Sequence, residues 1–375
     1  MIGAGIIGAA CADALAARGL QVTVIEQDTV GSGATAAGMG HLVVMDDNAA
    51  ELALSSYSIS LWNQLVADHP QRHEYSRCGT IWVAADEEEM AAARVKAQTL
   101  ARHALACQML TPAALYQREP QLRPGLAGAL LVAGDALVYP PKSARILLER
   151  AQERGAQLVA GAVAAIEDHG VRLGDGSQHQ AAHVVLAAGS RSVDLLPELP
   201  LQPKKGHVAI TDRYPGFIRH QLVELGYIKS AHAASGDTVA FNLQPRPTGQ
   251  ILIGSSRQFG TTNLAVETAM MTRMLRHAAS FTPALAQLNM LRCWTGLRAA
   301  SPDGLPLIGP SDARRGLWLA TGHEGLGITT SLATAQLLAG QIVGETTAIP
   351  FAPYLPSRFD GASTRVMHDA EVAHE

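Results

Sequence analysis

Residues 1–26 read MIGAGIIGAACADALAARGLQVTVIE. Gly3, Gly5 and Gly8 make a G-x-G-x-x-G run. A helical pattern follows, and then a strand pattern that ends at Glu26. In such a unit the first glycine allows a tight turn, the second lets a pyrophosphate approach the backbone, and the third lets helix and strand pack closely. The spacing therefore predicts a βαβ unit that binds a dinucleotide; a glycine-rich structural turn is the alternative.

The residues around this run add two features of a dinucleotide site. A helix predicted from Ala9 to Arg18 turns its free N–H groups and its positive dipole end toward the glycines, which suits phosphates. Glu26 stands where a carboxylate accepts hydrogen bonds from an adenosine ribose. Only Met1 and Ile2 precede Gly3, whereas a strand normally has about five residues. Either the first strand is very short or further residues precede it.

Composition narrows the class of protein. A chain of 375 residues is too long for one small core, so two domains are expected. It is 47% hydrophobic and 17% charged, as is ordinary for a soluble globular protein. The net charge of −4 comes without a basic stripe and gives no support for nucleic-acid binding. No apolar run reaches the roughly 18 residues of a membrane span.

The cysteine pattern argues against a metal centre. Cys11, Cys78, Cys107 and Cys293 are scattered and form no C-x-x-C pair, so neither a metal nor an iron–sulfur site is predicted. So few cysteines without regular spacing favour a reducing cytoplasm. The apolar N-terminus also lacks the basic leader of a signal peptide.

A second glycine-rich stretch runs from Val30 to His41. It holds too many glycines for a stable helix interior, and its small residues permit the close approach of a flat group. Because a dinucleotide site lies just upstream, this stretch is expected to run along the second half of a cofactor. A flexible loop is the alternative.

The rest of the sequence contains segments with helical periodicity and segments typical of strands. Helices are predicted at 51–65, 87–102, 143–154 and 328–343. Strands are predicted at 80–84, 183–189, 239–241, 250–254 and 317–321. The apolar run at 183–189 is typical of a buried parallel strand. The strands at 239–241 and 250–254 resemble an antiparallel pair. We therefore expect an α/β protein: a Rossmann-like domain into which a mainly antiparallel sheet with helices is inserted.

Four motifs point to a family. They are the N-terminal glycine run with Glu26; Ala36–Met39; Val184–Gly189; and Trp294–Arg298 followed by Pro302–Gly304 and Gly322–His323. Together they resemble the D-amino-acid oxidase-like FAD-dependent flavoproteins, which include glycine oxidase, sarcosine oxidases and amino-acid dehydrogenases. The resemblance covers nearly the whole chain. Residues 38–47 look most like the flavin subunit of D-hydroxyproline dehydrogenases from bacteria.

The resemblance implies FAD in an extended form and a discontinuous domain plan. Residues 1–45, 135–195 and 290–345 would form the FAD-binding domain, 46–134 and 196–289 the substrate domain, and 346–375 a C-terminal tail. Some relatives attach FAD through a cysteine near the C-terminus. No cysteine follows Cys293 here, so noncovalent FAD is expected.

The implied cofactor residues fall in five groups. They are Gly3, Ala4, Gly5, Ile6, Ile7 and Gly8 at the pyrophosphate; Glu26 and Gln27 at the ribose; Val163, Ala188 and Gly189, with Val163 meeting the adenine; Ala34, Thr35, Gly38, Met39 and Gly40; and Gly322, His323, Glu324, Gly325, Leu326, Gly327, Ile328 and Thr329. Residues 38–41 and 322–329 would line the isoalloxazine. A helix beginning near Gly325 could also stabilise the negative charge of a reduced flavin.

Arg298 matches the arginine that binds the substrate carboxylate in glycine-oxidase-like members. A guanidinium fork suits a carboxylate, although a structural ion pair is the alternative. Glycine oxidase has a second arginine in the loop that matches Glu324–Gly327, and this chain has no arginine there. The substrate-binding tyrosine of glycine oxidase matches Phe241 or Asn242 here. Other anchoring contacts are therefore expected, which argues against glycine as the substrate.

The implied reaction is hydride transfer from the α-carbon of a small amino or imino acid, such as a D-hydroxyproline-like D-amino acid, to FAD, giving an imine. His41 or His323 could accept a proton, since histidine titrates near neutral pH; each could instead only hydrogen-bond. His41 could also contact the substrate.

Three other functions stay open at this point. A glycine- or sarcosine-type oxidase would use oxygen. A non-catalytic flavin-fold subunit would serve a larger complex. An NAD-dependent dehydrogenase is disfavoured by the loop at Gly322–His323. The electron acceptor could be oxygen, a quinone or a redox partner subunit, which leaves a hetero-oligomer open.

Overall fold

Parallel strands surround the N-terminal glycine run in the computed structural model, which describes residues 1–226 and 236–359. Ile2 bridges to Ile25 of β1 (Thr23–Glu26) and to Leu186 of β11 (Val184–Leu186). The short first strand thus takes the central place between them. β7 (Gln157–Ala160) continues the sheet beside β1, and β18 (Leu317–Thr321) and then β17 (Leu307–Pro310) continue it beside β11. Among the described strands of this sheet, β17 and β18 form the one antiparallel pair.

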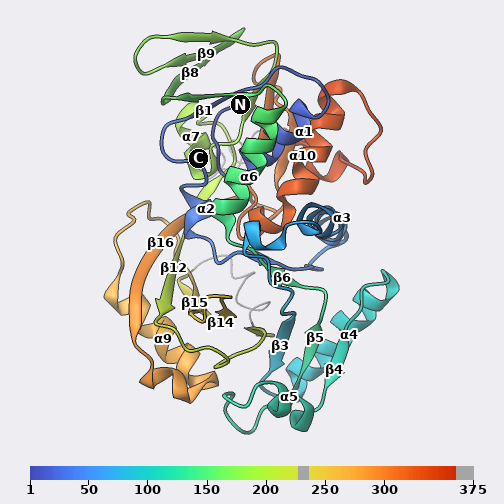
Figure 1. The fold of residues 1–375 in the computed structure, drawn as a ribbon, viewed down its shortest axis with the longest axis vertical. Helices are drawn as coiled ribbons and strands as arrows, with labels where there is room; N and C mark the ends of the chain where they lie inside the picture. Colours follow the sequence, from blue (N-terminus) through green and yellow to red (C-terminus); the bar gives the residue numbers. More distant parts are fainter. Residues whose placement is uncertain (227–235, 360–375) are drawn as a thin grey trace, which may run out of the picture.

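Helices cover this parallel sheet (Figure 1). α1 (Ile6–Ala16) packs against α6 (Pro140–Glu153) and α10 (Gly327–Val343). Its apolar residues are mainly alanines, which let the helices approach closely. α1 begins at Ile6, three residues before the predicted start at Ala9, because the helix already starts inside the glycine run.

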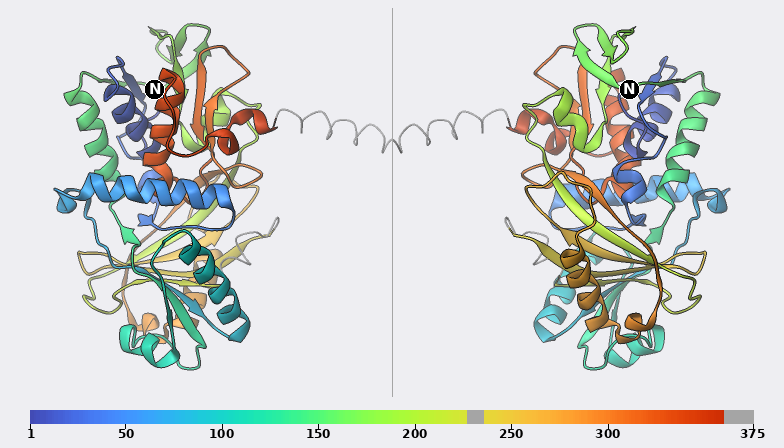
Figure 2. Two further views of the ribbon diagram at one scale, coloured as in Figure 1. Left: turned by 90° about the vertical axis from the view of Figure 1, so that its right-hand side faces the viewer. Right: turned by 90° about the vertical axis from the view of Figure 1, so that its left-hand side faces the viewer.

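A long helix, α3 (Ala49–Val66), crosses the middle of the molecule between the parallel sheet and the larger sheet (Figure 2). It packs on α10. The fully buried Trp62 of α3 donates through Nε1 to the carbonyls of Ile328 and Thr329, each at 3.2 Å. The start of α10 is therefore held from outside by a side chain of α3.

The larger sheet has eight strands. Their order is β16 (Met290–Ala300), β12 (Gln202–Thr211), β15 (Ile251–Arg257), β14 (Thr238–Pro245), β13 (Gln221–Glu224), β3 (Thr80–Ala84), β5 (Gly128–Val132) and β4 (Gln108–Leu110). Within residues 1–226 and 236–359, β13–β3 is the one parallel pair of this sheet. α9 (Thr268–Phe281) packs on β14 and β15, whereas α4 (Glu87–Arg102) packs on β3 and β5. They bury opposite faces, since Ile81 and Phe241 cluster with α9 while Trp82 and Val223 cluster with α4.

The smaller elements complete the chain. They are α2 (Ala34–Ala37), β2 (His41–Leu42), α5 (Pro112–Arg118), β6 (Ala136–Leu137), β8 (Val163–Glu167), β9 (Gly170–Leu173), β10 (Gln178–Gln180) and α7 (Ser192–Leu195). The irregular stretch predicted at 30–41 thus contains one short helix, whose four residues include no glycine. In the part of the chain that the structure describes, no helix has the length and apolar character needed to cross a membrane.

The predicted fold class is confirmed: an α/β protein with a large, mainly antiparallel sheet. One predicted boundary does not follow the sheets. β16 was assigned to the FAD-binding domain, yet it pairs with β12 from Gln202↔Ala300 onward and belongs to the eight-stranded sheet. The position of β16 is set by its pairing with β12, a strand far away in the sequence. The rest of the domain division stays a prediction, and its residues 227–235 and 360–375 lie outside the described ranges.

Candidate active site

The three glycines of the N-terminal run have different roles in the turn. Gly3 has a φ of +98°, and a β-carbon there would lie 2.8 Å from the Ala187 carbonyl oxygen. A β-carbon on Gly8 would collide with the carbonyl oxygen of Gly3. Gly5 has ordinary φ (−64°), and a β-carbon there would meet only Thr35 Oγ1, at 3.2 Å. Gly3 and Gly8 therefore make the turn, while Gly5 leaves its outer side open to a ligand.

Glu26 lies against this turn. Its Oε2 accepts from the Ala4 N–H at 2.6 Å, and its Oε1 accepts from the Asp28 N–H at 2.9 Å. Thr35 Oγ1 accepts from the Ile6 N–H at 2.9 Å. The predicted pyrophosphate and ribose residues are thus brought together at the start of α1. Gln27 is exposed and donates to Asp28.

The stretch from Ala34 to His41 passes between α10 and the eight-stranded sheet. A β-carbon on Gly38 would lie 2.7 Å from Ile328 Cδ1, and one on Gly40 would collide with the Val138 carbonyl oxygen. On the other side, Trp294 Nε1 donates to the Ala37 carbonyl at 3.1 Å. Met39 is buried with Val208 and Leu252. Small residues are therefore required here by close packing on both sides.

Three further predicted cofactor residues follow or flank the parallel sheet, and Ala188 lies beside the glycine run, because a β-carbon on Gly3 would be 3.4 Å from its Cα. Val163 begins β8, and Ala188 and Gly189 directly follow β11. Val163 and Ala188 are partly buried against the same hydrophobic cluster. The Gly189 carbonyl accepts from Thr321 Oγ1 at 3.3 Å. Their contact with a cofactor stays a prediction.

The loop from Gly322 to Leu326 leads into α10 and meets the His41 stretch. The Glu324 N–H donates to the Ala299 carbonyl at 2.8 Å, in the same strand as Arg298. Thr329 Oγ1 donates to the His41 carbonyl at 3.0 Å and accepts from the Val43 N–H at 3.2 Å. Two predicted flavin-side segments, distant in sequence, thus lie side by side.

A cavity of about 420 Å³ opens at this meeting point. Five of the predicted residues line it: His41, His323, Glu324, Gly325 and Leu326. The other lining residues are Val43, Met45, Asp47, Asn48, Glu51, Trp82, Gln202, Lys204, Gln221, Val223, Asn242, Arg257, Phe259, Ala300, Ser301, Pro302, Asp303 and Gly304. They come from the eight-stranded sheet, from α3 and the residues before it, and from the loop between β16 and β17, so the cavity lies between this sheet and the segments at His41 and Glu324.

Both cavity histidines are neutral at physiological pH. Burial lowers the pKa of His41 to about 4, against a hydrogen bond with the Gly325 backbone that raises it, and the nearby Arg298 lowers it further. Gln244 Nε2 lies 2.8 Å from His41 Nδ1. Burial lowers the pKa of His323 to about 3, and its Nε2 lies 3.0 Å from Thr334 Oγ1. Each ring is suited to hydrogen bonding in its uncharged form.

Arg298 lies on β16 beside the cavity but is outside the set of lining residues. It pairs with Lys204 of β12, so the two side chains share a sheet face. Its Nη1 donates to the Ser256 carbonyl at 3.0 Å. A β-carbon on Gly206 would lie 2.5 Å from Arg298 Nη2, so this glycine makes room for the guanidinium.

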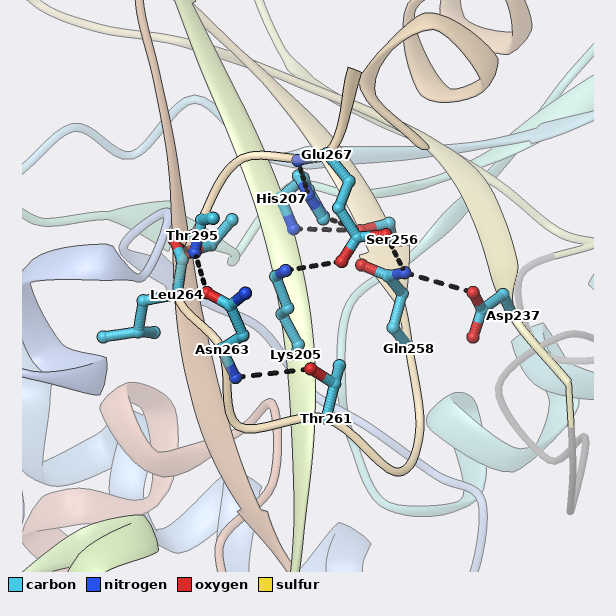
Figure 3. A network of polar contacts seen from close by, with 11 residues as sticks. Lys205, His207, Asp237, Ser256, Gln258, Thr261, Asn263, Leu264, Glu267 and Thr295 are labelled. Carbon is cyan, nitrogen blue, oxygen red and sulfur yellow. Dashed lines mark hydrogen bonds and ion pairs between the residues drawn. The ribbon is translucent and has the colours of Figure 1, made fainter. Parts of the chain in front are cut away.

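A polar network joins His207 of β12, Ser256 of β15 and the segment at Glu267 (Figure 3). His207 Nε2 accepts from the Glu267 N–H at 3.1 Å, and its Nδ1 lies 3.0 Å from Ser256 Oγ. Because a backbone N–H can only donate, His207 must be the neutral tautomer with its proton on Nδ1. The fully buried Lys205 donates to Glu267 Oε1 at 2.7 Å. The network thus connects the segment at Glu267 to Ser256, whose backbone carbonyl accepts the hydrogen bond from Arg298.

The sequence did not identify the charged residues of the cavity apart from Glu324. Lys204 Nζ and Arg257 Nε lie 3.2 and 3.5 Å from Glu324 Oε1. Both cations thus face the Glu324–Gly327 loop, a stretch in which this chain has no arginine. Arg257 ends a buried strand, an unusual place for a charge, which was the available signal.

The sheet wall of the cavity also carries polar side chains. Trp82, Val223 and Asn242 stand in register across β3, β13 and β14. Trp82 is 2% and Asn242 is 7% exposed. Among the described residues, Trp82 Nε1 and Asn242 Oδ1 have no hydrogen-bond partner. Phe241, the other residue at the tyrosine position, instead stacks on Phe281 behind the sheet, at 4.5 Å between ring centroids. Buried polar groups without partners indicate a ligand site.

Comparison with known proteins now decides the family. The family model described as FAD dependent oxidoreductase matches residues 1–341. The chain belongs to this family. It is 30% identical to a glycine oxidase of Pseudomonas putida, over 95% of this chain and 97% of that protein. It is 27% identical to the hydrogen cyanide synthase subunit HcnC of Pseudomonas aeruginosa, over 95% of each chain.

Solved structures agree. The crystal structure of glycine oxidase from Geobacillus kaustophilus has a TM-score of 0.85 and 28% identity, covering 95% of this chain and 97% of that one. The resemblance to D-amino-acid oxidase-like FAD-dependent enzymes is therefore confirmed, as is the predicted FAD cofactor. The chain is an FAD-dependent oxidoreductase.

The residues of this FAD-dependent oxidoreductase fit the cofactor. Gly5 leaves space beside the N-terminus of α1, where phosphates are favoured. The Glu26 carboxylate is fixed by two backbone N–H groups at the end of β1, the place of a ribose-binding acid. Packing on both sides also keeps the Gly38–Gly40 segment next to the cavity. The assignment of each residue to a part of FAD stays a prediction.

The glycine geometry predicts different outcomes for two alanine substitutions. Gly8→Ala forces a β-carbon onto the Gly3 carbonyl and should lower the unfolding free energy of cofactor-free protein by about 1–3 kcal/mol or more. Gly5→Ala, with φ in the range that alanine adopts, should change it by less than about 1 kcal/mol but weaken FAD binding. Denaturant unfolding and a flavin titration measure the two effects. Wild-type FAD affinity in Gly5→Ala would show that no phosphate approaches Gly5.

Proposed function

We propose that this protein oxidises a small amino or imino acid by hydride transfer from the α-carbon to FAD, giving an imine. The observation that carries the proposal is the cavity between the flavin-side segments and the eight-stranded sheet. It holds two cations, Lys204 and Arg257, and the acids Asp47, Glu51, Asp303 and Glu324. A zwitterion finds partners for both of its charges there. Bound FAD would supply the hydride acceptor.

The carboxylate of the substrate is assigned to Arg298, assisted by Lys204 on the same sheet face. A carboxylate is costly to bury unpaired, and a planar guanidinium can bind both of its oxygens. Gly206 leaves the guanidinium room beside the sheet, and the Ser256 carbonyl orients it. His41 contacts the substrate in this proposal and, like His323, does so as a neutral imidazole.

For the side chain of the substrate we propose a hydroxyl-bearing D-amino or imino acid, of the D-hydroxyproline type. Trp82 Nε1 can donate to a hydroxyl oxygen, and Asn242 Oδ1 can accept from its proton. The apolar Val223 between them would contact the carbon frame of the substrate. Glycine has no side chain that reaches either polar atom.

The electron acceptor is proposed to be a redox partner or quinone, with oxygen as the alternative. Two similar proteins are named as subunits of larger enzymes. One is the HcnC subunit of hydrogen cyanide synthase, and the other, 25% identical, is a subunit of an opine oxidase of Rhizobium meliloti. These names favour a hetero-oligomer. Similar glycine oxidases favour an oxidase that uses oxygen. A cytoplasmic location stays a prediction.

A spectral screen tests the reaction. Purified FAD-loaded protein should bleach at its flavin band under anaerobic conditions when mixed with a D-amino or imino acid, because the substrate's hydride reduces the flavin. D- and L-amino acids, proline derivatives and sarcosine should be compared, followed by turnover with oxygen or a dye. Absence of bleaching with every compound would favour a non-catalytic subunit.

Arg298→Ala should lower kcat/KM by roughly two orders of magnitude or more, because losing one partner of a buried charge pair costs about 2–5 kcal/mol. Arg298→Lys should fall between, since it keeps the charge but loses the fork. Flavin content should match wild type in both. Dye-linked turnover and flavin absorbance measure the outcome, and unchanged kinetics in Arg298→Ala would place the carboxylate elsewhere.

Trp82→Phe and Asn242→Leu should each lower the preference for a hydroxylated substrate over its unhydroxylated counterpart by about 2- to 10-fold, the effect of one neutral hydrogen bond of about 0.5–1.5 kcal/mol. The relevant ratio is kcat/KM for hydroxy-D-proline over D-proline. Taking a ratio cancels general effects of each variant on folding. An unaltered ratio in both variants would contradict the proposed hydroxyl site.

A further inference from the structure

We propose that Glu51, in the first turn of α3, is the base that takes the proton from the ammonium group of the substrate. This inference rests on the proposed function and adds a residue to it. An amino acid enters largely as an ammonium zwitterion. The nitrogen must offer a lone pair to form the C=N bond when hydride leaves the α-carbon. A proton therefore has to leave the nitrogen first, and the cavity must hold a group that can accept it.

The histidines are poorly suited to this step. His41 is already engaged by Gln244 and by the Gly325 backbone, and His323 by Thr334. Both rings are buried, and with pKa values of about 4 and about 3 they hold a proton weakly at neutral pH. General bases work best when their pKa lies near the operating pH.

Two of the cavity carboxylates are committed to cations. Asp303 is bound by Arg358, with Nε to Oδ2 at 2.7 Å and Nη2 to Oδ1 at 3.1 Å. Glu324 faces Lys204 and Arg257 through Oε1. Both carboxylates therefore already have cationic partners, in place of the ammonium group of the substrate.

Glu51 differs from these groups in its contacts. It lines the cavity, and within the described part of the chain its buried Oε2 has no hydrogen-bond partner. Its N–H is capped by Asn48 Oδ1 at 2.8 Å, which fixes the start of α3 and so the position of the side chain. Glu51 therefore combines a fixed position with an oxygen able to take a proton.

Charged groups from several parts of the fold surround Glu51 and act on its pKa. Burial first, and then the charges of Asp47 and Glu324, raise its pKa to about 7, while the Asp47 backbone N–H and Lys96 oppose the rise. Lys96 is itself paired with Asp46. The other titratable or charged residues that line the cavity are Lys204, Arg257, His41, His323 and Asp303. At neutral pH a substantial fraction of Glu51 is ionised and ready to accept.

The step balances. The N–H bond of the ammonium breaks, its proton joins a Glu51 oxygen, and the electron pair stays on nitrogen. Loss of hydride from the α-carbon to the flavin then leaves an iminium cation. The charges of Asp47 and Glu324, both of which act on Glu51, favour this positive charge.

The test compares pH profiles of kcat/KM, measured as anaerobic flavin reduction with the best substrate of the screen. Wild type should show an acid limb near pH 7, below which activity falls. Glu51→Gln keeps the size of the side chain but cannot accept the proton. Its kcat/KM at pH 7 should be lower than that of wild type by about 100-fold or more. The kcat/KM of Glu51→Gln should keep rising with pH up to the pKa of the free substrate amine. Its flavin content should equal that of wild type.

Two further variants separate proton transfer from a structural role. Asp47→Asn removes a charge that raises the pKa of Glu51, so the acid limb should move to lower pH. Glu87→Gln is the matched control, because Glu87 also lies in the first turn of a helix but is 80% exposed in its side chain and outside the cavity. It should reproduce the wild-type profile.

An unchanged acid limb in Glu51→Gln, with substrate still reducing the flavin, would overturn the inference and leave the proposed function standing. No flavin reduction in wild type at any pH would overturn both. A lower rate in Glu51→Gln at every pH, with the wild-type limb retained, would also overturn the inference and show that Glu51 only supports the fold of α3.

Discussion

The hydroxyl group of Thr329 holds the active site together. It donates to the His41 carbonyl and accepts from the Val43 N–H. The first turn of α10 is therefore hydrogen-bonded to the first residue of β2, which follows the glycine-rich segment, and to the residue directly after this strand. In sequence, His41 and Val43 precede Thr329 by 288 and 286 residues. Trp62 holds the same turn of α10 from the side of α3. The cavity exists because these contacts bring α3, α10 and residues 41–45 to one face of the eight-stranded sheet.

The electrostatics of the cavity follow from this convergence. α3 and the segment before it bring Asp47 and Glu51, β12 and β15 bring Lys204 and Arg257, and Glu324 stands between the two groups. Opposite charges thus occupy different walls, an arrangement that would orient the zwitterion proposed as the substrate. The uncharged histidines contribute direction and add no further charge. In the proposed reaction the surrounding protein would supply orientation and a proton acceptor, while the redox chemistry belongs to the cofactor.

The features that depend on local sequence could be predicted, and those that depend on distant pairing could not. The glycine run with Glu26 predicted the βαβ unit, because turn geometry and a helix start are decided within a few residues. The helix at 87–102 and the strands at 80–84 and 317–321 were found at their observed bounds for the same reason. His41 and the Gly322 loop were identified through family motifs and do line one cavity.

Long-range pairing explains what the sequence did not show. Trp82 and Asn242 become neighbours of one cavity only through the β3–β13–β14 register, which joins segments more than a hundred residues apart. Lys204 and Arg257 reach Glu324 through the same kind of assembly. The motif assigned Arg298 to the substrate carboxylate, and that role stays a prediction. The contact of Arg298 with Ser256 depends on β15, whose position relative to β16 no local pattern specifies.

The burial of His41 and His323 has a consequence for the protein's tolerance of acid. Both fold as neutral rings, whereas in the unfolded chain they bind protons near pH 6.5. As the pH falls below 6.5, the unfolded state takes up these protons first, and stability declines until the folded-state pKa values of about 4 and about 3 are reached. The rings that shape the cavity thus make the whole fold acid-labile, over a range where exposed carboxylates are still ionised.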